Sequence, residues 1–264
     1  MPDFSISIGA SGRNDGDNQR PKTMAELEIT GLRKEFGGVV ALAGVDISIP
    51  SEKIIGIIGP NGSGKTTLFN VIAGVHKPTS GRVLWRGKDI TGRPAHEIAR
   101  SGLVRTFQQA MSFPGLSVRE NVRIACEHGR SHPDGARSKW NSPEEILNFV
   151  GLTSLAGEIA GAMPFGNLRR LGIAVALGAN PSLLLLDEPA AGLSHNESDD
   201  LMELVLRFPK IGIGVCLIDH DMFLMSALCE RLVVLNFGTK IAEGPPTRVL
   251  NDSKVTEVYL GNEL

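Results

Sequence analysis

The sequence predicts an α/β fold in which helices cover a parallel β-sheet, and three observations lead to this prediction. A short apolar strand, a glycine-rich loop and a helix follow one another over residues 53–73. Two further buried strands, Leu183–Asp187 and Gly214–Ile218, flank a helical stretch at about His195–Phe208. Because two parallel strands need a right-handed crossover between them, this order indicates a parallel sheet. A helical block at about residues 112–166 is expected as an insertion into the core.

Length and composition allow one sizeable domain and argue against several classes of protein. The chain has 264 residues, of which 42% are hydrophobic, enough for a substantial core. Its net charge of −2 argues against a general nucleic-acid-binding protein. The three cysteines have spacings that form neither a metal site nor a disulfide framework. Residues 1–24, rich in Gly, Asp, Asn and Ser, are expected to be a disordered leader, and residues 25–264 one domain.

The N-terminal part of that domain is predicted to form an antiparallel sheet. Two runs that partly alternate apolar and polar residues, Leu27–Phe36 and Val39–Ile49, are expected to be strands joined at Gly37-Gly38. Beyond the glycine-rich loop and its helix, a turn at Pro78–Gly81 is expected before a short strand at Arg82–Arg86.

Helices are predicted for most of the middle of the chain. One is expected at Pro94–Arg100, with the proline in its first turn. Within the insertion, helical patterns at Val118–Cys126 and Pro143–Val150 flank a polar loop, His128–Asn141. A helix at Leu168–Ala179 is expected to return the chain to the core.

The C-terminal part is predicted to contain a hairpin and a last helix. The hairpin strands are Leu232–Asn236 and Lys240–Glu243, which meet around Phe237-Gly238. The helix is expected at Val255–Leu260.

The glycine-rich loop, Gly59–Thr66, reads GPNGSGKT and matches the phosphate-binding pattern G-x-x-x-x-G-K-[ST]. A strand at Lys53–Ile58 precedes it and a helix at Thr66–Ala73 follows, which is the context that the pattern requires. Glycines let backbone N–H groups turn inward toward a phosphate, and the helix N-terminus adds a positive dipole end. Lys65 is suited to bridging the outer phosphates, and the Thr66 hydroxyl to binding Mg²⁺.

Two other strand ends carry polar residues that suit the hydrolysis of a nucleotide. Leu183–Pro189 reads LLLLDEP, in which Asp187 is suited to holding hydrated Mg²⁺ and Glu188 to polarising an attacking water. His220 follows the strand Val215–Ile218, at the edge where open α/β sheets bind ligands, and is a candidate sensor of the γ-phosphate. The alternatives are a solvated strand end for the carboxylates and a structural role for the histidine.

With these motifs in place, the chain resembles the ATPase subunit of an ATP-binding cassette (ABC) transporter over about residues 25 to 264. The resemblance implies a P-loop NTPase (RecA-like) core with an N-terminal antiparallel β subdomain and an inserted helical subdomain. It also implies that the chain binds ATP and Mg²⁺ and hydrolyses the ATP. The implied nucleotide-binding residues of the loop are Gly59, Pro60, Asn61, Gly62, Ser63, Gly64, Lys65, Thr66 and Thr67.

Three more positions acquire roles through the same resemblance. Gln108 falls where the family's glutamine joins the core to the helical insertion, touches Mg²⁺ and the attacking water, and relays movement to membrane subunits. Phe36 falls where an aromatic ring stacks on adenine, with a core-facing aromatic as the alternative. Ala191–Ser194 matches the loop that crosses to a partner cassette.

Within the family the chain is most similar to the longer ATPase of branched-chain amino acid importers. The similarity rests on Phe36-Gly37-Gly38, Gly102–Gln108, Glu188–Leu193 and the Tyr259-Leu260-Gly261 ending. It implies a peripheral protein on the cytoplasmic face of the cell membrane, bound to a second ATPase subunit and to transmembrane permease subunits. A periplasmic or extracellular solute-binding protein would be an indirect partner, and nucleic acid none. Importers of urea or amides share these sequence segments, so an importer of that kind stays an alternative.

One segment departs from the family pattern. The signature Leu-Ser-Gly-Gly-Gln aligns with Met163–Asn167, which reads MPFGN, so that Pro164 replaces the serine and Asn167 the glutamine. The resemblance implies that this segment completes the site of the partner cassette, so one hypothesis is an asymmetric heterodimer in which only one site hydrolyses ATP well. A homodimer with a tolerated variant and a regulatory subunit with weak or no hydrolysis are the alternatives.

Overall fold

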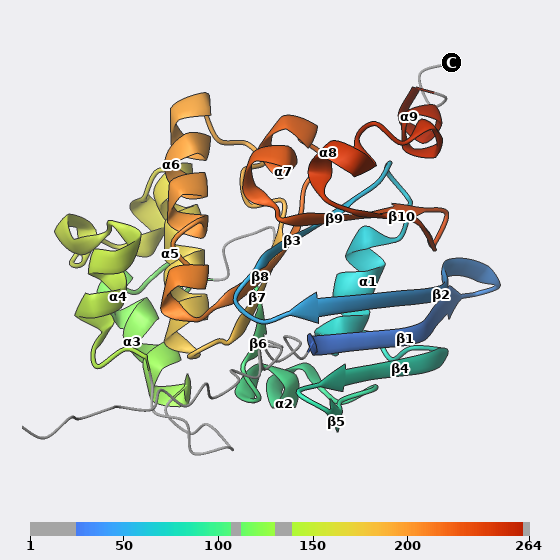
Figure 1. Cartoon of the computed structure of the whole chain (residues 1–264). Helices are drawn as coiled ribbons and strands as arrows, with labels where there is room; N and C mark the ends of the chain where they lie inside the picture. The colour runs from blue at the N-terminus through green and yellow to red at the C-terminus, as the bar shows by residue number, and fades with distance from the viewer. Residues whose placement is uncertain (1–24, 107–111, 130–138, 261–264) are drawn as a thin grey trace, which may run out of the picture.

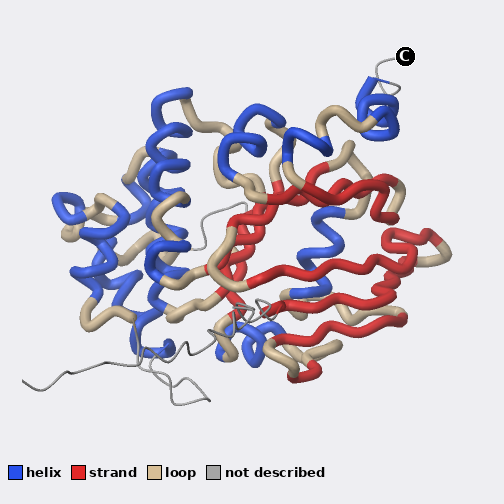
Figure 2. Tube along the Cα trace, in the orientation of Figure 1, coloured by secondary structure: helices blue, strands red, loops and turns tan. Residues whose placement is uncertain are grey.

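The structure is a computed structural model, and it describes residues 25–106, 112–129 and 139–260 (Figure 1). Two β-sheets occupy one side of the molecule, and a block of helices occupies the other (Figure 2). The α/β fold predicted from the sequence is confirmed, including the antiparallel sheet near the N-terminus. No helix within the described ranges is long and apolar enough to cross a membrane.

The larger sheet has six strands in the order β10-β9-β3-β8-β7-β6. Its strands are β3 (Ile54–Ile58), β6 (Leu103–Arg105), β7 (Leu183–Asp187), β8 (Gly214–Ile218), β9 (Arg231–Asn236) and β10 (Thr239–Gly244). All neighbours are parallel except β9 and β10, which form the predicted hairpin. Because the strands are parallel, the ends of β3, β7 and β8 and the loops that follow them meet at one edge of the sheet.

Alternating side chains of this sheet build two separate cores. Ile55 and Ile57 face one side and pack with helix α1 (Lys65–Ile72) and the smaller sheet. Ile54 and Ile58 face the other side and pack with the helices beyond β7 and β8. Such strands are apolar throughout because both of their faces are covered.

The smaller sheet is antiparallel, with the order β2-β1-β4-β5. Its strands are β1 (Ala25–Phe36), β2 (Val39–Pro50), β4 (Ser80–Trp85) and β5 (Lys88–Asp89). The first two are joined by a tight turn whose two glycines, Gly37 and Gly38, both have positive φ. Since α1 shares a core with β1 and β2, this sheet covers the helix that follows the phosphate loop.

Eight further α-helices lie within the described ranges. They are α2 (Ala95–Arg100), α3 (Val118–Gly129), α4 (Pro143–Val150), α5 (Phe165–Gly178), α6 (His195–Val205), α7 (Met222–Leu228), α8 (Pro246–Val249) and α9 (Ser253–Leu260). Single turns of 3₁₀ helix lie at η1 (Thr153–Leu155), η2 (Ala160–Ala162) and η3 (Pro209–Ile211). Helices α3, α4 and α5 contact one another and form the helical block.

Several boundaries differ from those expected, and the short elements β5, β6, α7, α8 and the 3₁₀ turns were not expected. Strand β4 begins at Ser80, inside the expected turn, because Ser80 pairs with Arg33 of β1. Helix α5 begins at Phe165, three residues before the expected start. Strand β6 has only three residues and is defined by its pairing with β7, so the sequence carries no periodic signal for it. Helix α7 follows Asp221, whose carboxylate accepts the N–H of Leu224 as an N-cap.

Candidate functional site

The phosphate loop lies between β3 and α1 and is held by close backbone packing. A Cβ atom on Gly59 would lie 2.1 Å from the carbonyl oxygen of Leu235, and one on Gly64 would lie 2.6 Å from that of Ala41. Both glycines also have positive φ, 150° and 104°. These positions therefore need glycine for space as well as for backbone conformation.

A turn of the β9–β10 hairpin joins the loop to the smaller sheet. The N–H of Gly238 donates to the carbonyl of Ser63 at 2.9 Å, and the carbonyl of Gly238 accepts the N–H of Ala43 at 2.8 Å. The sequence indicated a turn here but not this contact, because it links three segments that are far apart in the chain.

The start of α1 offers N–H groups to an anion. Leu68 is the first residue whose N–H is bonded within the helix, to the carbonyl of Gly64. The N–H groups at residues 64–67 precede it and have no partners within the helix. Thr66 is exposed and Thr67 half-buried at this end. The loop and the helix thus present donors and a positive dipole end to one place, as a phosphate site requires.

Lys65 is buried beside the loop. Its Nζ donates to the carbonyl oxygens of Gly59 and Pro60 at 2.6 and 2.9 Å. Burial lowers the pKa of the Lys65 ammonium, and the carboxylates of Glu188 and Asp187 act in the opposite direction. The ammonium is therefore held in the loop, close to two acidic groups at the end of β7, Asp187 and Glu188.

Asp187, the last residue of β7, is almost completely buried. Its Oδ2 accepts from Nη2 of Arg105 at 2.7 Å, and the two side chains are 1% and 7% exposed. Its Oδ1 has no hydrogen-bond partner within the described part of the chain. Burial raises the pKa of the Asp187 carboxyl, and the Arg105 guanidinium opposes that shift. The sequence pointed to Asp187 but carried no sign of its partner Arg105.

Glu188 follows directly and has a strained backbone. Its φ is 45°, in the left-handed region that a glutamate rarely adopts. Its N–H donates to the carbonyl of Ile218, at the end of β8, at 2.8 Å. Non-glycine residues in this region are frequent at functional sites, because the surrounding structure must hold them there.

His220 is brought to the same edge of the sheet by β8. Its side chain is 69% exposed, and its Nδ1 lies 3.7 Å from Oδ1 of Asp219. Asp219 itself is buried, and its Oδ1 accepts the N–H groups of His220 and Asp221. Burial raises the pKa of the Asp219 carboxyl. Asp219 orders the turn that carries His220, a role that sequence reasoning missed.

Of the two residues whose roles rest on the family resemblance, Phe36 and Gln108, the structure describes only Phe36. Phe36 is 42% exposed at the end of β1, so the alternative of a core-facing aromatic is wrong. Its ring packs edge-on against His76 with 5.3 Å between centroids, and Nζ of Lys34 lies 4.6 Å from its centre. Gln108 lies outside the described residues.

The segment Met163–Asn167 forms the start of α5. Pro164 is the N-cap residue, and its carbonyl accepts the N–H of Leu168 at 3.0 Å. Phe165 is 50% exposed, and a Cβ on Gly192 would lie 3.1 Å from its ring. A Cβ on Gly166 would lie 2.4 Å from Oε1 of Glu197. This segment therefore packs against the Ala191–Ser194 loop and the first turn of α6.

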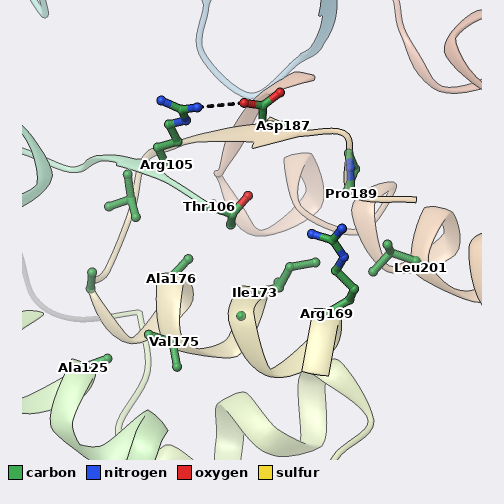
Figure 3. A pocket seen from close by; sticks show the side chains of 13 residues that line it. Arg105, Thr106, Ala125, Arg169, Ile173, Val175, Ala176, Asp187, Pro189 and Leu201 are labelled. Carbon is green, nitrogen blue, oxygen red and sulfur yellow. Dashed lines mark hydrogen bonds and ion pairs between the residues drawn. The ribbon is translucent and has the colours of Figure 1, made fainter. Parts of the chain in front are cut away.

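A cavity of about 240 Å³ lies between α5 and the ends of β6 and β7 (Figure 3). Its wall is mostly apolar, with Ile173, Val175 and Ala176 from α5. Arg105 and Asp187 line one end of it. The lining includes no residue of the phosphate loop, so this cavity is not the phosphate site itself.

Comparisons with known proteins agree with this geometry. A family model described as "ABC transporter" matches residues 42–191, more than half of the chain. A second model, "Branched-chain amino acid ATP-binding cassette transporter", matches residues 239–264. The chain is 36% identical, over 89% of its length and 97% of the relative's, to the Pseudomonas aeruginosa protein "High-affinity branched-chain amino acid transport ATP-binding protein BraF".

Solved structures of similar chains are ATP-binding cassettes as well. The ADP conformation of MJ1267, "an ATP-binding cassette of an ABC transporter", has a TM-score of 0.80 and 34% identity, covering 90% of this chain and all of that one. A dimeric, post-hydrolysis state of the cassette MJ0796, bound to ADP and Pi, has a TM-score of 0.70 and 26% identity, covering 83% and 98%. The chain therefore belongs to the ABC transporter family, as one of its nucleotide-binding ATPase cassettes.

Proposed function

We propose that this chain is the ATP-hydrolysing subunit of an importer for branched-chain amino acids, acting at the cytoplasmic face of the membrane. The observation that carries the solute class is the match of residues 239–264 to the branched-chain amino acid cassette model. The similarity to BraF over nearly the whole chain supports it. Related small polar solutes, including urea and amides, are the alternative.

Nucleotide binding is assigned to two regions. Loop residues Gly59–Thr67 would hold the phosphates through backbone N–H groups, which Pro60 lacks, and through the Lys65 ammonium. The support is that the first N–H groups of α1 have no partners within the helix. Phe36 would stack on the adenine, for which its exposed ring is the support. Displacement of Lys65 Nζ from the loop carbonyls would accompany the arrival of the phosphates.

The chain's residues fit an Mg²⁺ ion. Protein sites for Mg²⁺ use one or two carboxylates together with water and substrate phosphates. Asp187 offers a buried carboxylate oxygen that has no hydrogen-bond partner among the described residues, and Thr66 offers an exposed hydroxyl. Gln108 is the third proposed ligand, through the family resemblance. When bound, the ion would neutralise charge on the transferred phosphoryl group.

Hydrolysis would depend on groups at the ends of β7 and β8. Glu188 would accept a hydrogen bond from the attacking water and polarise it, and its strained backbone supports a functional role. His220 would contact the γ-phosphate, for which its high exposure next to the ordered Asp219 turn is the support. Gln108 would touch the same water.

Two cassettes would close around two ATP molecules and drive permease subunits in the membrane, with a solute-binding protein as an indirect partner. The dimeric MJ0796 cassette supports such an assembly. The partner is proposed to be a different ATPase subunit, because Pro164 lacks both a side-chain donor and an N–H at the segment that completes the partner's site. A homodimer is the alternative, because the start of α5 still offers N–H groups to a phosphate.

The test is reconstitution of the assembly. The chain would be tagged and purified from its membrane with the subunits that accompany it, and the complex placed in lipid vesicles. We expect ATP hydrolysis and uptake of leucine, isoleucine or valine by the wild type, and loss of both in Lys65→Ala. ATP hydrolysis with uptake of a different solute would overturn the solute class. Robust hydrolysis by the chain alone would overturn the need for a different partner.

A further inference from the structure

Arg105 is a buried arginine at the centre of the site for which sequence reasoning gave no role. It ends β6, pairs with Leu185 of β7, and its side chain is 7% exposed. Burying a guanidinium in this way is unfavourable unless its charge and donors are matched. The two terminal nitrogens of Arg105 donate to residues of two other elements, both of which belong to the nucleotide site.

The first set of contacts is with α1. Nη1 of Arg105 donates to Oδ1 of Asn70, and its guanidinium carbon lies 5.8 Å from the centre of the Phe69 ring. Phe69 is fully buried, so the ring presents a fixed surface to the cation. These contacts fix the guanidinium relative to the helix that begins at the phosphate loop.

The second contact is with the carboxylate of Asp187, and it engages only one of the two carboxylate oxygens. Nη2 of Arg105 donates to Oδ2 at 2.7 Å, whereas Oδ1 has no hydrogen-bond partner within the described ranges. In Figure 3 the dashed line joins Arg105 to one oxygen, and the other oxygen points away. The arginine therefore fixes the rotation of the carboxylate and leaves one oxygen available.

We propose that Arg105 is a positioning residue for the metal-binding carboxylate: it holds Oδ2 of Asp187 so that Oδ1 is kept for hydrated Mg²⁺. This inference rests on the proposed function, in which Asp187 serves Mg²⁺. A group that orients a metal ligand from behind commonly changes metal affinity about 10- to 100-fold when it is removed. Arg105 acts through Asp187 and does not itself touch nucleotide.

The experiment measures how binding of a fluorescent ATP analogue to the full chain depends on Mg²⁺. For Arg105→Gln we expect the Mg²⁺ concentration at half effect to rise about 10- to 100-fold. Affinity for the analogue in EDTA should stay close to that of the wild type, because the phosphate loop is intact. Arg105→Lys keeps the charge but replaces the planar guanidinium fork with a single compact ammonium, so its Mg²⁺ dependence should lie between those of the wild type and Arg105→Gln. Arg119→Gln, which breaks an exposed ion pair with Glu144, is the matched control and should behave as wild type.

Asp187→Asn separates failure of this inference from failure of the proposed function. If Asp187→Asn leaves the Mg²⁺ dependence unchanged, the metal role of Asp187 is wrong and the inference falls with it. If Asp187→Asn shifts it but Arg105→Gln does not, the inference alone is wrong. An Arg105→Gln protein that needs less Mg²⁺ would make Arg105 a competitor of the ion and would also overturn it. Should Arg105→Gln fail to fold, the Arg105→Lys protein decides on the same measurement.

Discussion

At the scale of single residues, the phosphate loop depends on glycines that have no room for a side chain. Gly59→Ala would place a methyl group 2.1 Å from the Leu235 carbonyl oxygen, in a backbone conformation almost confined to glycine. We expect it to lower the free energy of unfolding by more than about 3 kcal/mol. Gly62 also has positive φ, but nothing lies within 4 Å of the Cβ that Gly62→Ala would add. It should cost only about 1–2 kcal/mol.

Urea denaturation of the two variants measures this difference directly. Equal losses would show that backbone conformation, and not the contact with β9, makes Gly59 necessary.

The residues of the site differ in how far the sequence could reveal them. Lys65, Asp187 and Glu188 stand in local patterns, so a strand, a loop and a helix in order were enough to find them. Arg105 and Asp219 could not be found this way. Each is defined by contacts that form only after folding, and an arginine or aspartate next to a strand is common in any sequence.

At the scale of elements, the C-terminal helix α9 carries Tyr259 to the phosphate loop. Burial raises the pKa of the Tyr259 phenol to about 12, and the backbone N–H of Gly59 acts in the opposite direction. The folded state therefore prefers the neutral phenol. Its contribution to stability is complete below the pKa of an unfolded tyrosine, about 10, and is lost as the pH rises toward 12.

Tyr259→Phe removes this contribution, so its free energy of unfolding should depend less on pH than that of the wild type. The loss of stability between pH 8 and pH 11 should be smaller in the variant by about 1.4 kcal/mol, because the variant has no phenol to ionise. Burial also raises the pKa values of the thiols Cys216 and Cys229, but both thiols are present in both proteins and cancel in the comparison. Tyr259 is the only tyrosine, so ultraviolet absorbance of the phenolate follows it alone. A titration centred near pH 10 would mean that α9 does not bury it.

Elements were predictable where they carried a pattern of their own. Strands β7 and β8 have the expected bounds because a run of apolar residues fills both faces. Strand β6 is too short to show a hydrophobic pattern. Helix α7 has only seven residues and follows the segment with His220, which indicated a chemical role but not a helix. Helix α5 begins three residues early because Pro164 serves as its N-cap, and a proline just before a helix reads equally well as a turn.

At the scale of the whole molecule, the phosphate loop is where the two sheets and a hairpin meet. The Gly238 turn bonds to Ser63 and to Ala43, so the loop is tied to β2 and to the β9–β10 hairpin at once. The layers were predictable from the order of strands and helices. The hydrogen bonds of the Gly238 turn were not predictable, because they join backbone groups of segments that are distant in the sequence.

The central proposal is that ATP is hydrolysed at this chain's own site, with Glu188 polarising the water. The most direct test is steady-state ATP hydrolysis by the purified complex carrying Glu188→Gln in this chain, compared with the equivalent substitution in the partner cassette. Glu203→Gln, an exposed change on α6, is the control. We predict that Glu188→Gln lowers turnover about 10²- to 10⁴-fold while ATP binding persists, and that the partner's substitution costs far less. Turnover unchanged by Glu188→Gln, or lowered equally by both substitutions, would contradict this account.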